Sequence, residues 1–520
     1  LVKIDLLGNR ALSTVDEVAR RLQTPGKKGH PIAEDDGSVL ALLRAGETLG
    51  VGQLESPGMR HLLVQLAPKN IDDVIIALAL IRPGAAGVGM KAKFCAWRRG
   101  AAPPPKQHPL VKKLLKGTEG MMIFEDDGLR LLQGLCNLSA PEADRFRKRI
   151  AKNHHPEIGA SLRREFMDMA TPSGVGPEEL EDIWVQLEKF NQYSFCKSHA
   201  VSYGLIAWRS AWCKANEPLL FWTAALNNNA GMYPRRVYIG EIVRSGIAVL
   251  GPCVNRSLET FEPEGNAIRT GLGAIAGLAG DLVTQILLER NTNGLFTDAD
   301  SFRLRAGIPP EAMDRLRRGG ALDCFGLSRP TLALQGELKR LAGWQTGGSE
   351  LFEKVPDLEW IMPTLDPVEK SREEYPILGM TVSCPLQELM SPVIRSGLMK
   401  AGLDPSRLCP STGIGKYLGK EVMVAGMVAA ARGTHTKSGK LMQFLTLEDG
   451  AGFVDLTLFP GDCDILHHIT EGPYVGIGVV EEDLGVVTVR AKRVFPIHGR
   501  GNVIPIRDET TAIGFWEEEL

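Results

Sequence analysis

The sequence predicts a multidomain α+β protein. Its 520 residues are enough for about three to five domains. Apolar residues recur at helical spacing through most of residues 38–229, whereas five short segments near the C-terminal end alternate as strands. A large helical part followed by a small β part is therefore the expected architecture.

Composition excludes several classes of protein. The hydrophobic fraction of 44% supports packed cores, yet no stretch approaches the roughly 18 apolar residues of a membrane span. The nine cysteines form no C-x-x-C pair, which argues against a disulfide framework and a structural zinc site and suits a reducing cytoplasm. The first ten residues are expected to form a strand rather than a signal peptide. The first residue is Leu, so we expect a piece of a longer protein.

Charge is unevenly distributed although the net charge is only -2. Residues 91–116 hold eight Lys or Arg and no Asp or Glu, and residues 145–152 hold five more without an acidic residue. Such a run is often just a solvated face; the alternative is a surface that faces phosphates.

Periodicity places the elements in order. Residues 1–7 read as a short strand, followed by a helix at 11–22 with Ser13 or Thr14 as its cap. Residues 230–325 read as mostly helical with one or two strands, and residues 343–376 as a turn-rich linker with short structured pieces. Further helices are expected at 71–81, 141–152, 178–190 and 199–214.

The C-terminal strands suggest a small barrel. They are expected at residues 421–430, 441–447, 453–459, 474–480 and 486–494. The OB-fold is the common five-stranded barrel that binds nucleic acid strands, and the alternative is a barrel with a structural or protein-docking role. Lys437 and Lys440, between the first two strands, are candidate DNA-binding residues.

A glycine-rich turn indicates phosphate binding. In residues 271–280, GLGAIAGLAG, Gly277 and Gly280 bracket a tight turn before a helix that begins near Asp281. A helix–hairpin–helix element uses such free N–H groups to hold one DNA phosphate without reading sequence. A plain turn with a packing glycine is the alternative. A weaker second copy is expected at residues 308–323, with glycines at 319 and 320.

Two polar positions suggest further chemistry. Asp5 lies in an apolar strand two residues after Lys3, so it is either an edge-strand residue in solvent or a metal-bound carboxylate. One carboxylate cannot complete a two-metal site. Ser198 is the predicted cap of the helix at 199–214, where Lys197 and His199 either face phosphate or form a structural cap with a packed His.

Five motifs in order resemble the bacterial DNA polymerase III alpha-subunit family, the C-family polymerases. The run VKIDLLG at 2–8 is similar to the palm strand V-K-F-D-F-L-G, and QLESPGM at 53–59 to F-Q-x-E-S-x-G-M. The IRPG of 81–84 is similar to the F-R-P-G turn of the fingers. ADRFRKRIAK at 143–152 and FNQYSFCKSHAVSY at 190–203 match A-D-x-L-R-R-A-M-x-K-K and F-x-x-Y-x-F-N-K-S-H-A-x-x-Y.

The resemblance implies a domain order and a site. It implies a palm piece at 1–37, fingers at 38–229, tandem helix–hairpin–helix at 230–325, a linker and connecting segment at 326–414, an OB-fold at 415–500 and a tail at 501–520. Asp5 matches the third catalytic aspartate, which would bind Mg²⁺ in a two-metal site completed by residues outside this chain. The positions implied to bind nucleotide or primer–template are Lys3, Arg82, Arg147, Lys148, Lys152, Lys197, Ser198 and His199.

The implied function is template-directed DNA synthesis on primer–template DNA from dNTPs, in the bacterial cytoplasm. The family's first two catalytic aspartates and its PHP domain lie in earlier segments, so we expect this chain alone to be inactive and its partner to be the missing palm and PHP segment. The alternative is a non-catalytic DNA-binding remnant. Two departures from the family motifs leave this alternative open: Phe124-Glu125-Asp126 replaces Y-Q-E, and Lys148 replaces the second Arg of R-R.

The family's two branches differ in accessory features. The segments NNNAGMYP at 227–234 and VNRS at 254–257 look closer to the error-prone branch. The sliding-clamp peptide Q-x-x-[LM]-F has only a poor counterpart at residues 345–352, where a flexible linker with incidental apolar residues is the preferred interpretation. These features favour translesion or accessory synthesis.

Overall fold

The computed structural model describes most of the chain in two compact units. It describes residues 9–22, 32–82, 89–103, 107–152, 156–190, 195–228, 231–341, 361–436, 438–464 and 466–497. The first unit comprises Leu1–Glu217 with Asp483–Val486, and the second Pro218–Glu482 with Val487–Leu520. The expected strand at residues 1–7 lies outside the described residues.

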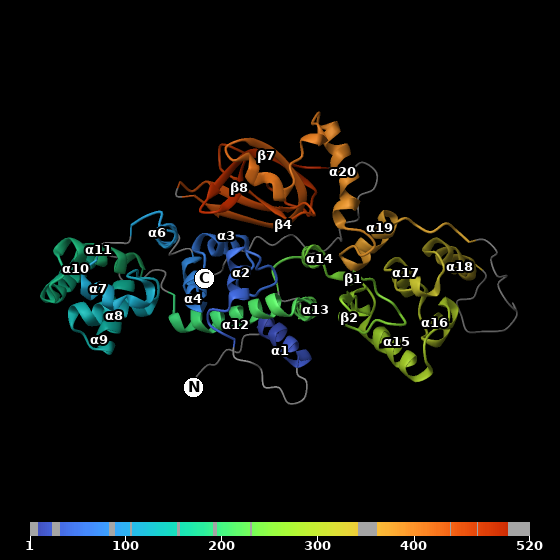
Figure 1. Ribbon diagram of the computed structural model, residues 1–520, viewed down its shortest axis with the longest axis horizontal. Helices are drawn as coiled ribbons and strands as arrows, with labels where there is room; N and C mark the ends of the chain where they lie inside the picture. Colours follow the sequence, from blue (N-terminus) through green and yellow to red (C-terminus); the bar gives the residue numbers. More distant parts are fainter. Residues whose placement is uncertain are drawn as a thin grey trace. The chain divides into compact units, whose positions relative to one another are not determined.

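The described elements of the first unit are helical (Figure 1). Its α-helices are α1 (Arg10–Leu22), α2 (Gly37–Arg44), α3 (Pro57–Leu66), α4 (Ile71–Leu80), α6 (Met90–Arg98), α7 (Pro109–Leu114), α8 (Glu125–Cys136), α9 (Ala140–Ala151), α10 (Pro156–Ala170), α11 (Pro177–Phe190) and α12 (Lys197–Asn216). The helices expected near 11–22, 71–81, 141–152, 178–190 and 199–214 are thus confirmed. The cap of α1 is Asn9, which accepts from Leu12 N at 3.2 Å, and not Ser13 or Thr14.

Helix α12 organises one half of the first unit. It packs against α1, α2 and α4 (Figure 1). Gly204 permits the close approach of α4, because a Cβ there would lie 2.6 Å from Ile75 Cγ1. Buried Lys214 donates to the carbonyls of Glu47 at 2.8 Å and Leu49 at 2.9 Å. These contacts fix the axis of α12 and therefore the position of its first turn.

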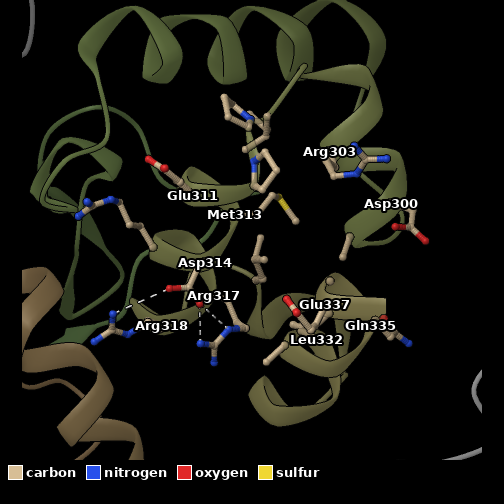
Figure 2. Close-up of a pocket in the computed structure, with 18 of the residues that line it drawn as sticks. Asp300, Arg303, Glu311, Met313, Asp314, Arg317, Arg318, Leu332, Gln335 and Glu337 are labelled. Carbon is tan, nitrogen blue, oxygen red and sulfur yellow. Dashed lines mark hydrogen bonds and ion pairs between the residues drawn. The ribbon is translucent and has the colours of Figure 1, made fainter. Parts of the chain in front are cut away.

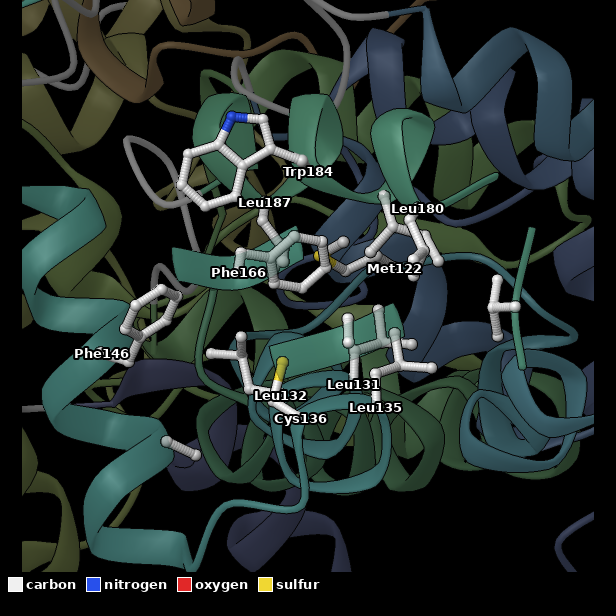
Figure 3. Packing of buried hydrophobic residues seen from close by; sticks show 14 of the residues in the cluster. Met122, Leu131, Leu132, Leu135, Cys136, Phe146, Phe166, Leu180, Trp184 and Leu187 are labelled. Atoms are coloured by element: carbon white, nitrogen blue, oxygen red, sulfur yellow. The ribbon is translucent and has the colours of Figure 1, made fainter. Parts of the chain in front are cut away.

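Helices α7 to α11 form a second half around their own core. Figure 3 shows Phe166 in the middle of this core, close to Trp184 and Leu187. The rings of Phe166 and Trp184 lie 5.6 Å apart. Fully burying a side chain of this size stabilises a fold by about 1.5–3 kcal/mol, so this core can hold α8 and α9 in register.

The second unit begins with α13 (Pro218–Asn228), twelve residues before the predicted boundary at 230. It continues with α14 (Arg235–Arg244) and a three-stranded sheet in the order β1 (Ala248–Leu250), β3 (Ala267–Arg269), β2 (Glu262–Glu264). The pair β1–β3 is parallel and β2–β3 is antiparallel. Helices α15 (Gly280–Asn293), α16 (Ala299–Arg305) and α17 (Pro310–Arg318) follow.

The segment 326–414, expected as a linker and connecting segment, contains α18 (Arg329–Leu341), α19 (Pro367–Leu378) and α20 (Leu386–Lys400). Pro376 and Pro392 lie inside helices, where proline is disfavoured and so misleads a reading from sequence. Buried Glu374 accepts from Val382 N and Ser383 N, both at 2.9 Å, and pairs with Arg329 at 3.0 Å. These bonds make α18 and α19 part of the folded unit.

Five strands close into a barrel in the order β4–β5–β6–β8–β7. They are β4 (Glu421–His435), β5 (Leu441–Glu448), β6 (Phe453–Leu458), β7 (Tyr474–Asp483) and β8 (Val486–Pro496), so all five predicted strands are confirmed. Val422 and Val424 of β4 point into the barrel core, whereas Met423 and Ala425 belong to a second core with Leu389 of α20. Burial on both faces explains why β4 reads as one continuous apolar run.

A buried carboxylate joins the barrel to α14. Glu448, at the end of β5, pairs with Arg236 at 3.2 Å and with Arg244 at 3.0 Å. Arg236 also donates to the carbonyl of Val428 in β4. Burial raises the pKa of Glu448, and the two guanidinium groups oppose that rise. The side chains of Arg236 and Glu448 are only 2% and 8% exposed, so neither charge has water as a substitute partner.

We predict that Glu448→Gln lowers the free energy of unfolding of the second unit by about 3–5 kcal/mol, because it leaves a buried guanidinium unpaired. Urea denaturation measures this. Glu421→Gln is the matched control, since its pair with Lys492 at 2.9 Å is half exposed and is worth about 0–1 kcal/mol. Equal losses in both variants would contradict the assignment.

Candidate functional site

The first turn of α12 begins at Lys197, with Cys196 as the N-cap residue and no side-chain capping bond. The predicted cap Ser198 is wrong, because it is the second residue of the helix and its Oγ lies 3.0 Å from Cys196 Sγ. The first N–H groups of a helix carry partial positive charge, so this helix start favours an anion.

Cations and aromatic rings gather at this helix start. The guanidinium of Arg82 lies 4.6 Å from the centre of the Phe195 ring. His199 lies 5.3 Å from Phe195 and 4.5 Å from Tyr203, measured between ring centres. The ammonium of Lys197 lies 5.6 Å from the centre of the Phe124 ring. We call these six residues the α12-entry cluster. It contains three of the residues expected to bind nucleotide or primer–template, Arg82, Lys197 and His199.

The start of α8 places carboxylates beside the same cluster. Glu125 N donates to the carbonyl of Phe195 at 3.0 Å, which ties the two segments together. Lys197 N donates to Asp126 Oδ2 at 3.3 Å. An anion that approaches α12 therefore meets both the cations of the cluster and two acidic side chains.

The local fold around these carboxylates is fixed by Asp127. Its buried Oδ2 accepts from Ile123 N at 3.0 Å and from Phe124 N at 2.8 Å. Burial raises the pKa of Asp127, and the two backbone hydrogen bonds act in the opposite direction. Asp127 therefore caps α8 and is a positioning residue for Phe124 and Glu125.

Arg147 is internally paired. It lies 2.6 Å from Glu125 and 3.1 Å from Asp144, and its side chain is only 12% exposed. Its Nε is buried and has no hydrogen-bond partner. The predicted phosphate-binding charge of Arg147 is therefore compensated by two carboxylates of the chain itself.

Lys148 and Lys152 stay on the outer surface of α9. Lys148 pairs with Asp144 at 2.7 Å, and its side chain remains more than half exposed. Lys152 is exposed and follows the last helical residue. Farther along the same helix, Arg149 pairs with Glu165 at 2.7 Å. Much of the basic run at 145–152 is thus balanced locally by acidic side chains.

The glycine turn before α15 has the predicted form. Gly277 has a φ of +74°, a conformation that favours glycine. Helix α15 begins at Gly280, and its N-cap residue Ala279 has no side chain that could accept a hydrogen bond. Arg315 donates to the carbonyl of Ala276 at 3.0 Å, which places a guanidinium beside the turn.

A second turn of this kind occurs at Gly307 rather than at 319 and 320. Gly307 has a φ of +58° and precedes α17, whereas Gly319 follows the end of α17. The sequences AGLAGD at 276–281 and AGIPPE at 306–311 share the spacing from glycine to helix. This repeat was the signal that the sequence analysis missed.

The barrel surface carries a basic and aromatic pair that was also missed. Phe444 of β5 is 39% exposed and lies directly opposite Arg432 of β4. Lys440 is exposed in the turn that joins these strands, where its N–H donates to Thr436 Oγ1 at 3.2 Å. An exposed ring next to cations is typical of surfaces that stack nucleic acid bases.

Three predicted residues lie outside the described part of the chain: Lys3, Asp5 and Lys437. Within the described residues no three His, Cys, Asp or Glu side chains gather where they could hold a metal ion. These residues alone therefore do not fit a two-metal centre. None of the described helices has the length and apolar character that a bilayer span requires.

A hollow of about 1030 Å³ lies between α16, α17 and α18. Figure 2 shows Met313 and Leu332 in its lining, with charged residues around them. Asp314 pairs with Arg317 at 2.7 Å and with Arg318 at 3.9 Å. Because acidic and basic side chains both line it, the hollow does not favour a polyanion, and no role is assigned to it.

Comparison with known proteins agrees with this geometry. Residues 11–174 match the family model of the bacterial DNA polymerase III alpha subunit finger domain, and residues 246–332 match a helix-hairpin-helix motif. An error-prone DNA polymerase of Mycobacterium tuberculosis is 30% identical over 514 residues, 95% of this chain and 45% of the relative. A DNA polymerase III subunit alpha of Aquifex aeolicus is 28% identical over 510 residues, 95% of this chain and 42% of the relative.

The chain belongs to the bacterial DNA polymerase III alpha-subunit family, the C-family polymerases. An error-prone DNA polymerase of Symbiobacterium thermophilum, 27% identical over 544 residues, covers 95% of the chain as well. This C-family chain spans less than half the length of each of these relatives. The finger-domain match includes α8 and α9, which place Glu125 and Arg147.

We predict that Glu125→Gln strengthens the binding of tripolyphosphate about threefold to tenfold, because one carboxylate is removed from Arg147 and from the α12 start. Isothermal titration at constant salt measures the affinity. The control Glu165→Gln frees Arg149 on the outer face of α9, away from the cluster. An equal gain in the control would show a general charge effect and contradict a specific site.

Proposed function

We propose that these residues form the fingers, DNA-gripping and barrel parts of a template-directed DNA polymerase that transfers nucleotides from dNTPs to a primer 3′-OH. The observation that carries this proposal is the α12-entry cluster, where Arg82, Lys197 and His199 from two separate segments meet at the start of α12. The N-cap residue of this helix makes no side-chain capping bond, and Asp126 accepts from Lys197 N. Such a site can hold a triphosphate and supply positioning and charge stabilisation.

The second unit supplies the grip on duplex DNA. The turn at Gly277 leads into α15 and can present backbone N–H groups to one phosphate. At the Gly307 turn Pro309 and Pro310 carry no N–H, so α17 would use the N–H groups of Glu311 and Ala312. Arg315, beside Ala276, adds a cation to the first turn. Phosphate contacts of this kind position the protein on DNA without reading its sequence.

The barrel is proposed to be an OB-fold near the single-stranded template. Its closed five-strand order supports this, as does exposed Phe444 opposite Arg432. Lys437 and Lys440 come between β4 and β5 in the sequence and would contribute charge. We propose that the role is error-prone or accessory synthesis, since relatives named error-prone DNA polymerase match over 95% of the chain.

Catalysis would require acidic metal ligands in addition to those of this chain. Two-metal nucleotidyl transfer needs clustered acidic ligands, and Asp5 supplies one. We infer that Asp5 takes part with acidic residues outside this chain in holding Mg²⁺, so the 520 residues by themselves would bind DNA without extending a primer. Lys3 would lie beside the triphosphate.

A second candidate is a non-catalytic DNA-binding protein. The pairing of Arg147 with Glu125 and Asp144 favours it, because a compensated arginine is poorly available to a triphosphate. In that case the hairpin turns and the barrel would keep their DNA contacts while the fingers lose theirs.

We predict that Gly280→Ala weakens binding to primer–template DNA about 10- to 100-fold, because a methyl group blocks a charge-assisted phosphate contact. A Cβ at Gly280 meets nothing within 4 Å, so the fold should be unaffected. Gly37→Ala is the matched control, since it is also the first residue of a helix and also meets nothing. Fluorescence anisotropy at several salt concentrations measures both; equal affinity in both variants would remove the hairpin from the DNA site.

We predict that Asp5→Asn, made in the longest reading frame that contains these residues, lowers primer extension by about 10³-fold or more while DNA binding changes little. The control Asp16→Asn alters an exposed carboxylate paired with Arg20 on α1. Unchanged extension in Asp5→Asn would exclude Asp5 from the site. A parent protein that binds DNA but extends no primer would support the second candidate.

A further inference from the structure

Two cysteines of the second unit lie where the ends of the hairpin region meet. Cys253 follows β1, and Cys324 lies in the short 3-10 turn η4 (Asp323–Phe325) after α17. Val254 N donates to the carbonyl of Ala321 at 3.0 Å, and Cys324 Sγ lies 3.9 Å from the same carbonyl oxygen. These contacts bring the two cysteines close together, and each thiol is the largest influence on the pKa of the other.

The surroundings of Cys253 are cationic. Arg269 donates to the carbonyl of Gly251 at 2.7 Å, and Arg290 donates to the carbonyl of Val254 at 2.9 Å, so guanidinium groups flank the cysteine on both sides. The neighbouring Cys324 thiol and the charge of Arg269 lower the pKa of Cys253, although burial acts in the opposite direction. The thiolate is the form of cysteine that reacts with oxidants.

Other buried cysteines of this chain lack such an environment. Burial raises the pKa of Cys95 and of Cys213 to about 11, and that of Cys136 to about 12. Those thiols are therefore expected to be inert near neutral pH. Cys253 is 7% exposed, whereas its partner Cys324 is exposed, so a small oxidant can approach the pair from the side of Cys324.

We propose that Cys253 and Cys324 are a peroxide-sensitive dithiol whose oxidation closes both glycine turns, at 277 and 307, into one covalent loop. The Cys253 thiolate attacks hydrogen peroxide, the O–O bond breaks, and a sulfenic acid and hydroxide form. The Cys324 sulfur then attacks the sulfenic sulfur, and its proton leaves with the departing hydroxide as water. Two thiols become one disulfide while one peroxide becomes two waters.

This assignment adds a modification site to the hairpin region. A reversible disulfide of this kind in a reducing compartment is typical of redox-sensing cysteines. The link would join the loop before the first turn to the segment after the second, and so would limit motion between the two turns. It does not depend on whether the chain is a polymerase.

The test treats the reduced full chain with equimolar hydrogen peroxide, blocks free thiols and identifies linked peptides by mass spectrometry. We expect one dominant 253–324 link that dithiothreitol reverses, and none in Cys253→Ser or Cys324→Ser. In Cys324→Ser, the Cys253 sulfenic acid should accumulate and be trapped by dimedone. Cys409→Ser is the control, because Cys409 is partly exposed and contacts Pro410 rather than a second thiol; it should link like the parent chain.

Two results would overturn the proposal. One is oxidation of Cys196 or Cys409 before any 253–324 link appears. The other is a 253–324 link that is only one of many disulfide pairings and forms equally often in native buffer and in denaturing urea. A pair that is preformed by the fold should be favoured in native buffer alone. The decisive measurement is the 253–324 link in the unmutated chain, so a variant that folds poorly does not change the result.

Discussion

The second unit depends on one buried carboxylate. Glu448 ends a barrel strand and accepts two arginines from α14, while Arg236 also reaches a carbonyl of the neighbouring strand. The charges of Arg236 and Glu448 have left water, and they are tolerable because each is paired and hydrogen-bonded. The geometry leaves little freedom, since a shift of α14 would separate the pairs. The barrel, and the exposed strands it presents, are therefore held against the helix that precedes the hairpin region.

Ion pairing also determines which basic side chains of the first unit are available to a ligand. Arg147 and Lys148 share Asp144, and Arg147 also binds Glu125. A basic run in sequence thus becomes a largely neutral surface in the fold. Arg82, by contrast, is exposed and lies over the ring of Phe195. Cation–π contacts hold such a charge in place without neutralising it, which is why the α12 start is the better candidate for an anion site.

Secondary structure was predictable where burial follows a simple period. The barrel strands and α4, α9, α11 and α12 were all expected within a few residues. Failures have local causes. Prolines lie inside α19 and α20, where a helix is not expected from sequence. The cap of α12 was predicted at Ser198 because Ser is a common cap residue, whereas Cys196 occupies that position without a side-chain capping bond. The hairpin at Gly307 was missed because its helix begins with proline rather than glycine.

The sequence by itself determined the family, the order of the elements and the residue types at the sites, because motif spacing and periodicity are properties of the chain alone. Tertiary structure decided which charges are available. Whether Arg147 faces a ligand or a carboxylate, and whether Cys253 meets a second thiol, depends on residues distant in the chain that only packing brings within a few ångströms. Electrostatic interactions weaken with distance and with hydration. Which charges interact therefore depends on the fold and cannot be predicted from neighbouring residues in the sequence.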